Sequence, residues 1–338
     1  MEDVGRMVLK LERAPAFGTN ITYPLVCGNG FKSFVKTSLQ YTKAFFKGND
    51  AQGWGKSATV RATKSLVPCV HTAIQAGIQI FDCSRAYQGS EQRLARALKD
   101  VPRNKFFLIT KIDDQSQFTG KVKECFEESL KQLQTDYVDL LLLHWPVDYP
   151  KTGDKRLDDS VPVYARSWHE LEQIFKSGGA KSIGVANFSI VQLEKLREYA
   201  EIMPMANEFE CHPLCIRKEL NEYCISNHIQ VFAYASLCAM DKRLLNPQMA
   251  GIAERYEKTI PQIILKWHIQ RGRVPIFGTS KTQRIKEYAS LDDFTLTDRE
   301  LDEIDSQNIN YRAFPDSEHC DFTKGIWLGW ENYKDCCP

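Results

Sequence analysis

The sequence has no surplus of charge of either sign, which excludes partners that are held through charge alone. Its 44 Lys and Arg residues are matched by 43 Asp and Glu residues, so the formal net charge is +1. Nucleic acids and anionic membrane surfaces attract proteins that carry a marked positive surplus. The sequence therefore predicts that neither is the main partner.

A long apolar run is also missing. The longest one, YVDLLLLHWPV at 137–147, is far too short to span a bilayer. The first residues, MEDVGRMVLKLERAP, alternate charged and apolar side chains and do not form the apolar centre of a secretory signal. We therefore expect a cytoplasmic protein without a membrane segment.

Cysteine pairs with metal-binding spacing are lacking as well, although the chain has 11 cysteines. A zinc site typically uses paired CxxC spacings, and none is present. The cysteine count is odd and no secretion signal is recognisable, which argues against a disulfide framework. We expect free thiols in a reducing compartment and no bound metal ion.

What the chain does contain is a globular composition with a repeated pattern. Hydrophobic residues make up 43% and charged residues 26% of 338 residues, which is enough for a large core. Short apolar runs alternate with stretches of helical period that are bounded by capping residues. The runs lie at 78–84, 106–112, 138–145, 181–187, 205–212, 229–236 and 274–280, with an earlier candidate at 23–30.

Eight apolar strands joined by amphipathic helices are typical of a closed (β/α)8 TIM barrel. The alternative is a doubly wound open sheet with a dinucleotide-binding turn, which needs three spaced glycines before a helix. The segment GNGFKSF at 28–34 supplies only the first two of these glycines, so the barrel is favoured. We expect a single α/β domain over 1–338, with the barrel at 22–308, a long first βα loop at 31–64, and an aromatic-rich C-terminal loop at 309–338 over the barrel mouth.

The polar residues of this barrel gather at one end. In a parallel barrel the functional groups come from the carboxyl ends of the strands, which all open on the same mouth. Nearly every apolar run of this chain ends in a polar residue or a glycine. These ends are Gly30, Asp82, Lys111, His144, Asn187, Glu208, Tyr234 and the segment GTSKTQR at 278–284.

Asp82 and Lys111 end neighbouring strands, and we expect them to form an ion pair inside the barrel, because a buried aspartate needs a charged partner. Tyr87 and His144 are expected at the same mouth. A nearby cation lowers the pKa of a phenol, while burial raises it. We expect the lowering by Lys111 to exceed the rise from burial, so that a net drop in pKa turns Tyr87 into a usable general acid. A purely structural bridge between two strands is the alternative for the ion pair.

A set of motifs carries a resemblance to a known family. FDCSRAYQGSE (81–91), ITK (109–111), LLLLHWP (140–146), IGVANF (183–188), NEFECHP (207–213), FAYASL (232–237) and GTSKTQRI (278–285) occur in this order. With these motifs the chain resembles the aldo-keto reductases over 22–308. The resemblance implies carbonyl reduction with a nicotinamide cofactor. It places Asp82, Tyr87, Lys111 and His144 on the catalytic tetrad, with Tyr87 as the proton donor.

The resemblance also implies where the cofactor binds across the barrel mouth. NADPH (NADP+) is expected in preference to NADH, because the forked, charged Arg284 suits an adenosine phosphate. Asn187 and Glu208 fall at the nicotinamide carboxamide, and Tyr234 falls at the nicotinamide ring. The implied cofactor contacts are Gly30, Asp82, Asn187, Glu208, Tyr234, Leu237, Asp241, Thr279, Ser280, Lys281 and Arg284.

Four positions depart from the family pattern. Ala186 replaces a serine and Glu208 replaces a glutamine at the carboxamide site. Gly278 replaces a frequent lysine and Tyr288 an asparagine at the adenosine end. These changes leave the choice between NADPH and NADH open, while the proton-transfer residues are unchanged.

We expect an NAD(P)H-dependent oxidoreductase that reduces a small aldehyde or ketone and acts as a monomer. Position alone predicts apolar walls for the substrate from Phe31, Trp54, Trp145, Trp327 and Trp330. Two alternatives stay open at this point. One is a biosynthetic aldo-keto reductase with one dedicated substrate, and the other is a non-catalytic nucleotide-binding redox sensor.

Overall fold

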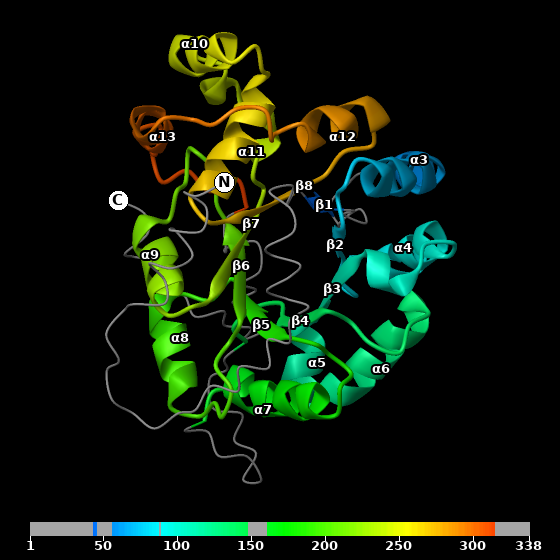
Figure 1. Ribbon diagram of the computed structural model, residues 1–338. Coiled ribbons are helices and arrows are strands. Elements are labelled where there is room, and N and C mark those ends of the chain that lie inside the picture. Colours follow the sequence, from blue (N-terminus) through cyan, green and yellow to red (C-terminus); the bar gives the residue numbers. More distant parts are fainter. Residues whose placement is uncertain (1–42, 46–55, 88, 148–160, 315–338) are drawn as a thin grey trace. The chain divides into compact units, whose positions relative to one another are not determined.

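A computed structural model describes residues 43–45, 56–87, 89–147 and 161–314, which belong to one compact unit. For the described residues before Leu66, only the backbone is described. Eight parallel strands follow one another around a closed barrel, and the first pairs with the last. Figure 1 shows these strands at the centre with helices outside them. The predicted TIM barrel is confirmed.

The strands follow the chain order around the barrel. They are β1 (Lys43–Phe45), β2 (Ile80–Asp82), β3 (Phe107–Ile112), β4 (Leu140–Leu143), β5 (Ile183–Ala186), β6 (Ala206–Glu210), β7 (Gln230–Tyr234) and β8 (Val274–Phe277). Every residue of β2 to β6 and of β8 is buried. Such continuous burial is expected for a parallel sheet that is covered on both faces.

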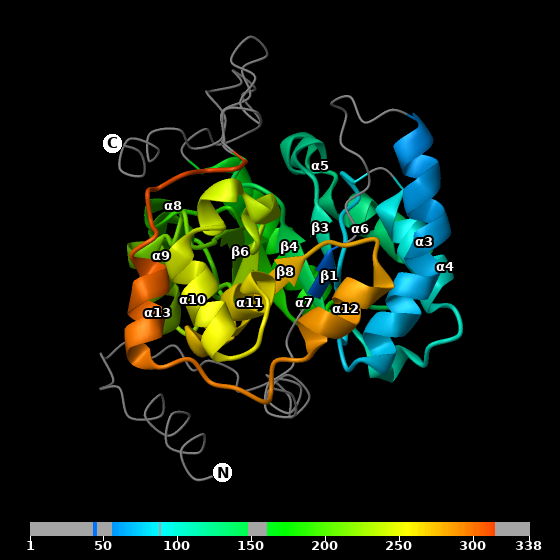
Figure 2. The same ribbon diagram turned by 90° about the horizontal axis from the view of Figure 1, so that it is seen from above.

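The helices form the outer layer, which Figure 2 shows from above. They are α3 (Lys56–Gln75), α4 (Ser90–Leu98), α5 (Asp114–Thr119), α6 (Val122–Leu133), α7 (Val163–Lys176), α8 (Ile190–Arg197), α9 (Lys218–Ser226), α10 (Pro247–Arg255), α11 (Ile260–Gln270), α12 (Thr282–Ala289) and α13 (Asp298–Asp305). Short 3-10 turns lie at Arg103–Lys105, Cys238–Met240 and Lys242–Leu244. The helices turn their apolar faces inward, and one buried apolar cluster runs between helices and strands.

Three of the described outer helices begin at a capping box, which fixes where each helix starts. Ser189, Thr259 and Thr297 each accept a hydrogen bond from the backbone N–H three residues later. The Gln or Glu at that third position accepts from the backbone N–H of the cap in return. This exchange satisfies two backbone donors that a helix start leaves without a partner.

Gly184 in β5 marks a close approach of the barrel strands. A Cβ at this position would lie 2.6 Å from the backbone oxygen of Ala206 and 2.8 Å from Cδ2 of Leu142. Both distances are shorter than a carbon contact allows, so any larger side chain would push β4 and β6 away from β5. The glycine therefore keeps the barrel closed on this side.

The first strand is not where the sequence predicted it. The apolar run at 23–30 lies outside the described residues, and the strand that closes the barrel is Lys43–Phe45, with Phe45 opposite Asp82 and Ala44 opposite Phe277. The segment expected to be a long loop, 31–64, therefore contains a strand and the start of α3. A strand of three residues is too short to show a period of two, which is why its pattern was not recognised.

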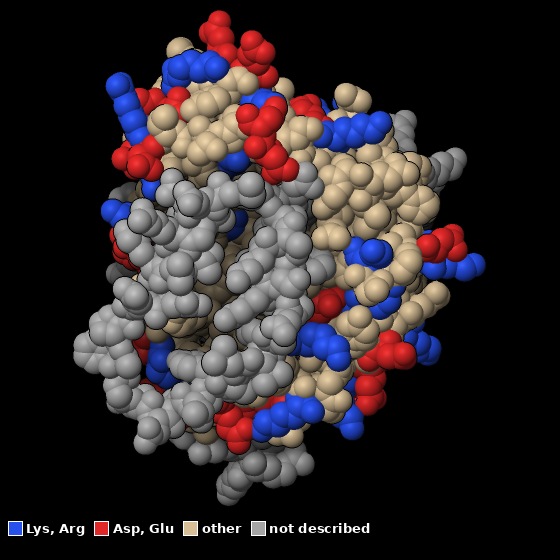
Figure 3. All heavy atoms as spheres, viewed as in Figure 1, with Lys and Arg blue, Asp and Glu red and all other residues tan. Residues whose placement is uncertain are grey.

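The surface mixes charges of both signs. On the face shown in Figure 3, Lys and Arg side chains lie next to Asp and Glu side chains among the described residues. Within the described ranges, none of the helices combines the length and the apolar character that crossing a membrane requires.

Candidate active site

The ion pair expected between Asp82 and Lys111 is present. Asp82 ends β2 and Lys111 lies in the neighbouring strand β3, with Nζ of Lys111 2.5 Å from Oδ1 of Asp82. The two residues are 0% and 1% exposed. A charge pair that is so fully removed from water is costly to maintain, since each ion loses its hydration. A buried ion pair that is kept at this cost indicates a functional role at the barrel mouth.

Lys111 has a second carboxylate partner that the sequence did not predict. Oε1 of Glu208, in β6, lies 3.2 Å from Nζ of Lys111, and Glu208 is 1% exposed. The backbone oxygen of Cys83 lies 3.4 Å from the same nitrogen. One ammonium is thus shared by two buried carboxylates. The sequence pointed to this second partner only through Glu208 itself, which stands where the resemblance to the family expects an uncharged glutamine.

Tyr87 and His144 meet at the same end of the barrel. The hydroxyl of Tyr87 lies 3.4 Å from Nε2 of His144, and their rings meet edge to face. Nζ of Lys111 lies 5.6 Å from the centre of the Tyr87 ring. Oγ of Ser84, which the sequence did not single out, lies 3.4 Å from Nδ1 of His144 and orients its ring. The four predicted tetrad residues are therefore brought together.

A cavity of about 280 Å³ opens beside Tyr87. It is lined by Ser84, Arg85, Tyr87, Gly89, Ser90, Glu91, Gln92, Glu128 and Gln132. The lining comes from the β2–α4 connection, from α4 and from α6, so the cavity lies next to the loop that carries Tyr87.

The predicted effect of Lys111 on Tyr87 is wrong in its net direction. Burial raises the pKa of Tyr87 above its ordinary value by more than Lys111 lowers it, and Asp82 and Glu208 raise it further. Burial also disfavours the ammonium of Lys111, yet the same two carboxylates raise the pKa of Lys111 overall. The lysine thus stays charged, and the tyrosine keeps its proton.

Asn187 and Tyr234 form a short hydrogen-bonded chain at the ends of β5 and β7. The hydroxyl of Tyr234 donates to Oδ1 of Asn187 at 2.9 Å, and Nδ2 of Asn187 donates to the backbone oxygen of His144 at 2.9 Å. The backbone of Asn187 is left-handed, with φ of 65°, a conformation that Asn tolerates better than most residues. This turn directs the amide across the mouth, toward the tetrad.

The segment after β8 presents cations and hydroxyl groups at the start of α12. Ser280, Lys281 and Arg284 are exposed and Thr279 is half-buried. Oγ1 of Thr279 accepts from the backbone N–H of Lys281 at 3.1 Å, which shapes the turn into the helix. A helix start with two nearby cations is chemically suited to a phosphate.

Leu237 and Asp241 lie on the loop after β7. Leu237 packs against the buried core. The carboxylate of Asp241 accepts hydrogen bonds from the Arg243 side chain at 2.8 and 2.6 Å. The Arg243 guanidinium lies 3.7 Å from the centre of the Tyr311 ring. Asp241 therefore holds a link between this loop and the chain after α13.

The predicted substrate walls fall mostly outside the described residues. Phe31, Trp54, Trp327 and Trp330 lie there, as does the cofactor residue Gly30. Trp145 is described: it is 5% exposed, and its ring centre lies 6.5 Å from that of His144.

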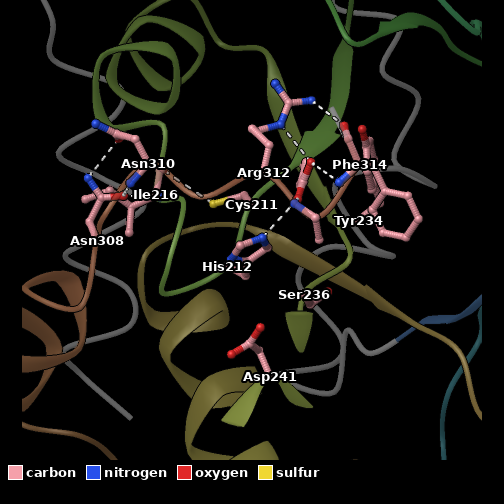
Figure 4. A network of polar contacts seen from close by, with 12 residues as sticks. Cys211, His212, Ile216, Tyr234, Ser236, Asp241, Asn308, Asn310, Arg312 and Phe314 are labelled. Atoms are coloured by element: carbon pink, nitrogen blue, oxygen red, sulfur yellow. Dashed lines mark hydrogen bonds and ion pairs between the residues drawn. The ribbon is translucent and has the colours of Figure 1, made fainter. Parts of the chain in front are cut away.

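A second buried polar network, which the sequence did not predict, ties the chain after α13 to β6. Glu210, 0% exposed, accepts from Nε of Arg312 at 2.7 Å and from the backbone N–H of Ala313 at 2.6 Å, and its carboxylate lies 3.0 Å from Nε2 of His212. The ring of Phe314 then meets Tyr234 edge to face, with centres 6.2 Å apart. Figure 4 shows Arg312, Phe314 and Tyr234 gathered in this way.

Glu210→Gln is expected to lower the free energy of unfolding by about 3 kcal/mol, because a neutral amide replaces the buried anion that pairs with the Arg312 guanidinium. Burial opposes the charge of Glu210, but His212 and Arg312 lower its pKa to about 2, from an ordinary 4.5. A lowered pKa stabilises the fold above pH 4.5, and this contribution is lost as the pH falls toward 2. Urea unfolding should show a difference in free energy of unfolding between the wild type and Glu210→Gln that is full at neutral pH and becomes smaller below pH 4.5. A difference in free energy of unfolding that does not depend on pH would contradict the pairing of the Glu210 charge with Arg312.

Comparison with known proteins agrees with this geometry. The model of the aldo/keto reductase family matches residues 51–309. The chain is 36% identical over 296 residues to the uncharacterized oxidoreductase YtbE of Bacillus subtilis (strain 168), covering 85% of this chain and 100% of that protein. It is 34% identical over 288 residues to glyoxal reductase of the same organism, covering 84% of this chain and 99% of that protein.

The fold comparison gives the same result. The crystal structure of a Bombyx mori aldo-keto reductase in complex with NADP superposes with a TM-score of 0.72 at 28% identity, and the match covers 83% of this chain and 93% of that one. Family match, relatives and barrel all agree with an NAD(P)H-dependent oxidoreductase. The chain therefore belongs to the aldo/keto reductase family.

Proposed function

We propose that this protein reduces a small aldehyde or ketone to an alcohol with NADPH, and that Tyr87 is the general acid. The observation that carries the proposal is the buried Lys111–Asp82 pair at 2.5 Å, next to a Tyr87 hydroxyl that lies 3.4 Å from His144. A purely structural ion pair would not need a tyrosine and a histidine beside it. Proton donors that converge on one point are what carbonyl reduction requires.

Each side chain has a distinct task in this proposal. Tyr87, whose pKa is raised above its ordinary value by burial, is protonated at neutral pH and donates to the alkoxide, which is a stronger base than a phenolate. His144 lies close enough to bind the same carbonyl oxygen and orient it. Lys111 supplies positive charge beside the forming phenolate, and Asp82 holds that ammonium in place.

The described residues also fit NADPH, which would supply the hydride when bound. An amide has two N–H groups and two lone pairs, so Asn187 can hold a carboxamide besides its bonds to Tyr234 and His144. The exposed Lys281 and Arg284 at the start of α12 are suited to the adenosine phosphate that distinguishes NADPH from NADH. The relative solved with NADP supports this choice.

For the substrate, we propose a small aldehyde such as glyoxal. The support is the 34% identity to a protein named glyoxal reductase, over 99% of its length. We also propose a reducing compartment such as the cytoplasm. The seven described cysteines are buried and free, which supports it.

The purified protein is expected to consume NADPH with glyoxal and methylglyoxal, and to use NADPH at least about tenfold more efficiently than NADH. The preference follows from the charged hydrogen bonds that only the extra phosphate accepts. Steady-state rates from nicotinamide absorbance, over a panel that adds ketones and aromatic aldehydes, measure both quantities. Equal use of the two cofactors would contradict the phosphate assignment. Tight NADPH binding without turnover across the panel would favour a nucleotide-binding sensor.

A further inference from the structure

The charge balance around Lys111 is unusual for a proton-transfer site. Its ammonium lies 2.5 Å from Asp82 and 3.2 Å from Glu208, and all three residues are at most 1% exposed. One positive charge therefore faces two acids. The carboxylate of Asp82 is enough to neutralise Lys111, so Glu208 brings a charge that the ion pair itself does not require.

This additional acid bears on Tyr87 through Lys111. Nζ of Lys111 lies 5.6 Å from the centre of the Tyr87 ring, and Asp82, Cys83 and Glu208 are among the groups that offer it acceptor oxygens. An ammonium has three N–H groups. An acceptor at Glu208 competes with the Tyr87 oxygen for one of them, and its negative charge opposes the formation of a phenolate nearby.

We propose that Glu208 is a positioning residue that draws the Lys111 charge away from Tyr87 and so makes Tyr87 hold its proton more tightly. The inference rests on the proposed function, in which Tyr87 is the acid. In reduction the carbonyl carbon gains a hydride from the cofactor, its oxygen gains the proton of Tyr87, and the phenolate regains a proton from water. In alcohol oxidation the same phenolate must accept the proton.

Glu208 therefore shifts to higher pH the range in which each direction of the reaction runs. A tyrosine that holds its proton serves reduction up to a high pH and is a scarce base for oxidation at neutral pH. With an uncharged residue of the same shape at position 208, more of the positive charge of Lys111 would act on Tyr87, and Asp82 would still pair with the ammonium. As an order of magnitude, two unit charges about 10 Å apart at an effective dielectric of 20 interact by the equivalent of about one pH unit.

The test is the pH profile of Glu208→Gln in both directions, with NADPH and methylglyoxal for reduction, and with NADP+ and the corresponding alcohol for oxidation. The pH at which reduction falls to half its maximum should move down by about one unit. The rise of oxidation with pH should move down by the same amount. Loss of a merely structural contact would lower the rates without moving either midpoint.

Two further variants and a second readout separate the effect of the charge at position 208 from a structural effect of the substitution. Glu208→Asp keeps the charge and should keep the wild-type midpoints, while Glu208→Met removes the charge and should shift them as Gln does. Without cofactor, the tyrosinate absorbance of each protein minus that of its Tyr87→Phe counterpart isolates the titration of Tyr87. In Glu208→Gln this titration should begin at lower pH than in the wild type.

The outcomes separate this inference from the proposed function. If Tyr87→Phe keeps its activity, the proposed function fails, and Glu208 has no acid to act on. If Tyr87→Phe is inactive but neither the midpoints nor the tyrosinate titration move in Glu208→Gln and Glu208→Met, the inference is overturned while the proposed function stands.

Discussion

Tyr87→Phe is expected to lower kcat for carbonyl reduction by about 10² to 10⁴, the range that general acid catalysis contributes. The substitution removes one hydroxyl and keeps the ring, so the edge-to-face contact with His144 is retained. NADPH affinity, measured by fluorescence titration, should stay close to that of the wild type. Stopped-flow turnover with methylglyoxal gives the rate.

The matched control for this variant is Tyr137→Phe. Tyr137 precedes β4, whereas His144 follows it, so the two lie at opposite ends of the same strand. The ring of Tyr137 packs under the Arg103 guanidinium at 4.0 Å, a contact that phenylalanine keeps. Wild-type rates are expected for Tyr137→Phe. If Tyr87→Phe also turned over at wild-type rates, Tyr87 would not be the acid.

Lys111→Met is expected to abolish measurable reduction and to lower the free energy of unfolding by about 3 to 5 kcal/mol. The cost arises because Asp82 and Glu208, both buried, lose the one cation that they share. The loss of activity arises because no positive charge then stabilises the Tyr87 phenolate. Urea unfolding followed by circular dichroism gives the stability, and the methylglyoxal assay gives the activity.

A triple variant separates the two effects of Lys111→Met. Adding Asp82→Asn and Glu208→Gln removes both carboxylate charges, and replacing a buried ion pair by neutral groups is often nearly neutral for stability. Stability should therefore return most of the way to that of the wild type, while reduction stays absent. A triple variant as unstable as Lys111→Met would show that the lysine stabilises the fold through packing alone.

The barrel and the mouth residues were predictable because topology alone brings them together. Strands that are apolar along their whole length and then end in Asp82, Lys111 or His144 specify both a parallel barrel and the edge where these groups meet. The same reasoning explains why seven of the eight strands were recognised from their apolar runs.

What could not be predicted depends on distances between elements. The sequence identified Glu208 as a departure, but not that β6 brings its carboxylate within 3.2 Å of Lys111. The net pKa direction of Tyr87 was also wrong, because burial, the largest influence, outweighs the lowering by Lys111, and Asp82 and Glu208 raise the pKa further. The pair of Glu210 with Arg312 joins residues 102 positions apart, which no local pattern signals.

The most direct test of the account is a crystal structure with NADPH and an unreactive carbonyl analogue. We expect the analogue's oxygen at about 2.6 to 3.2 Å from both the Tyr87 hydroxyl and Nε2 of His144. Lys111 should still be held between Asp82 and Glu208 in that complex. An oxygen bound away from Tyr87, with another donor on it, would contradict the assignment of Tyr87 as the acid.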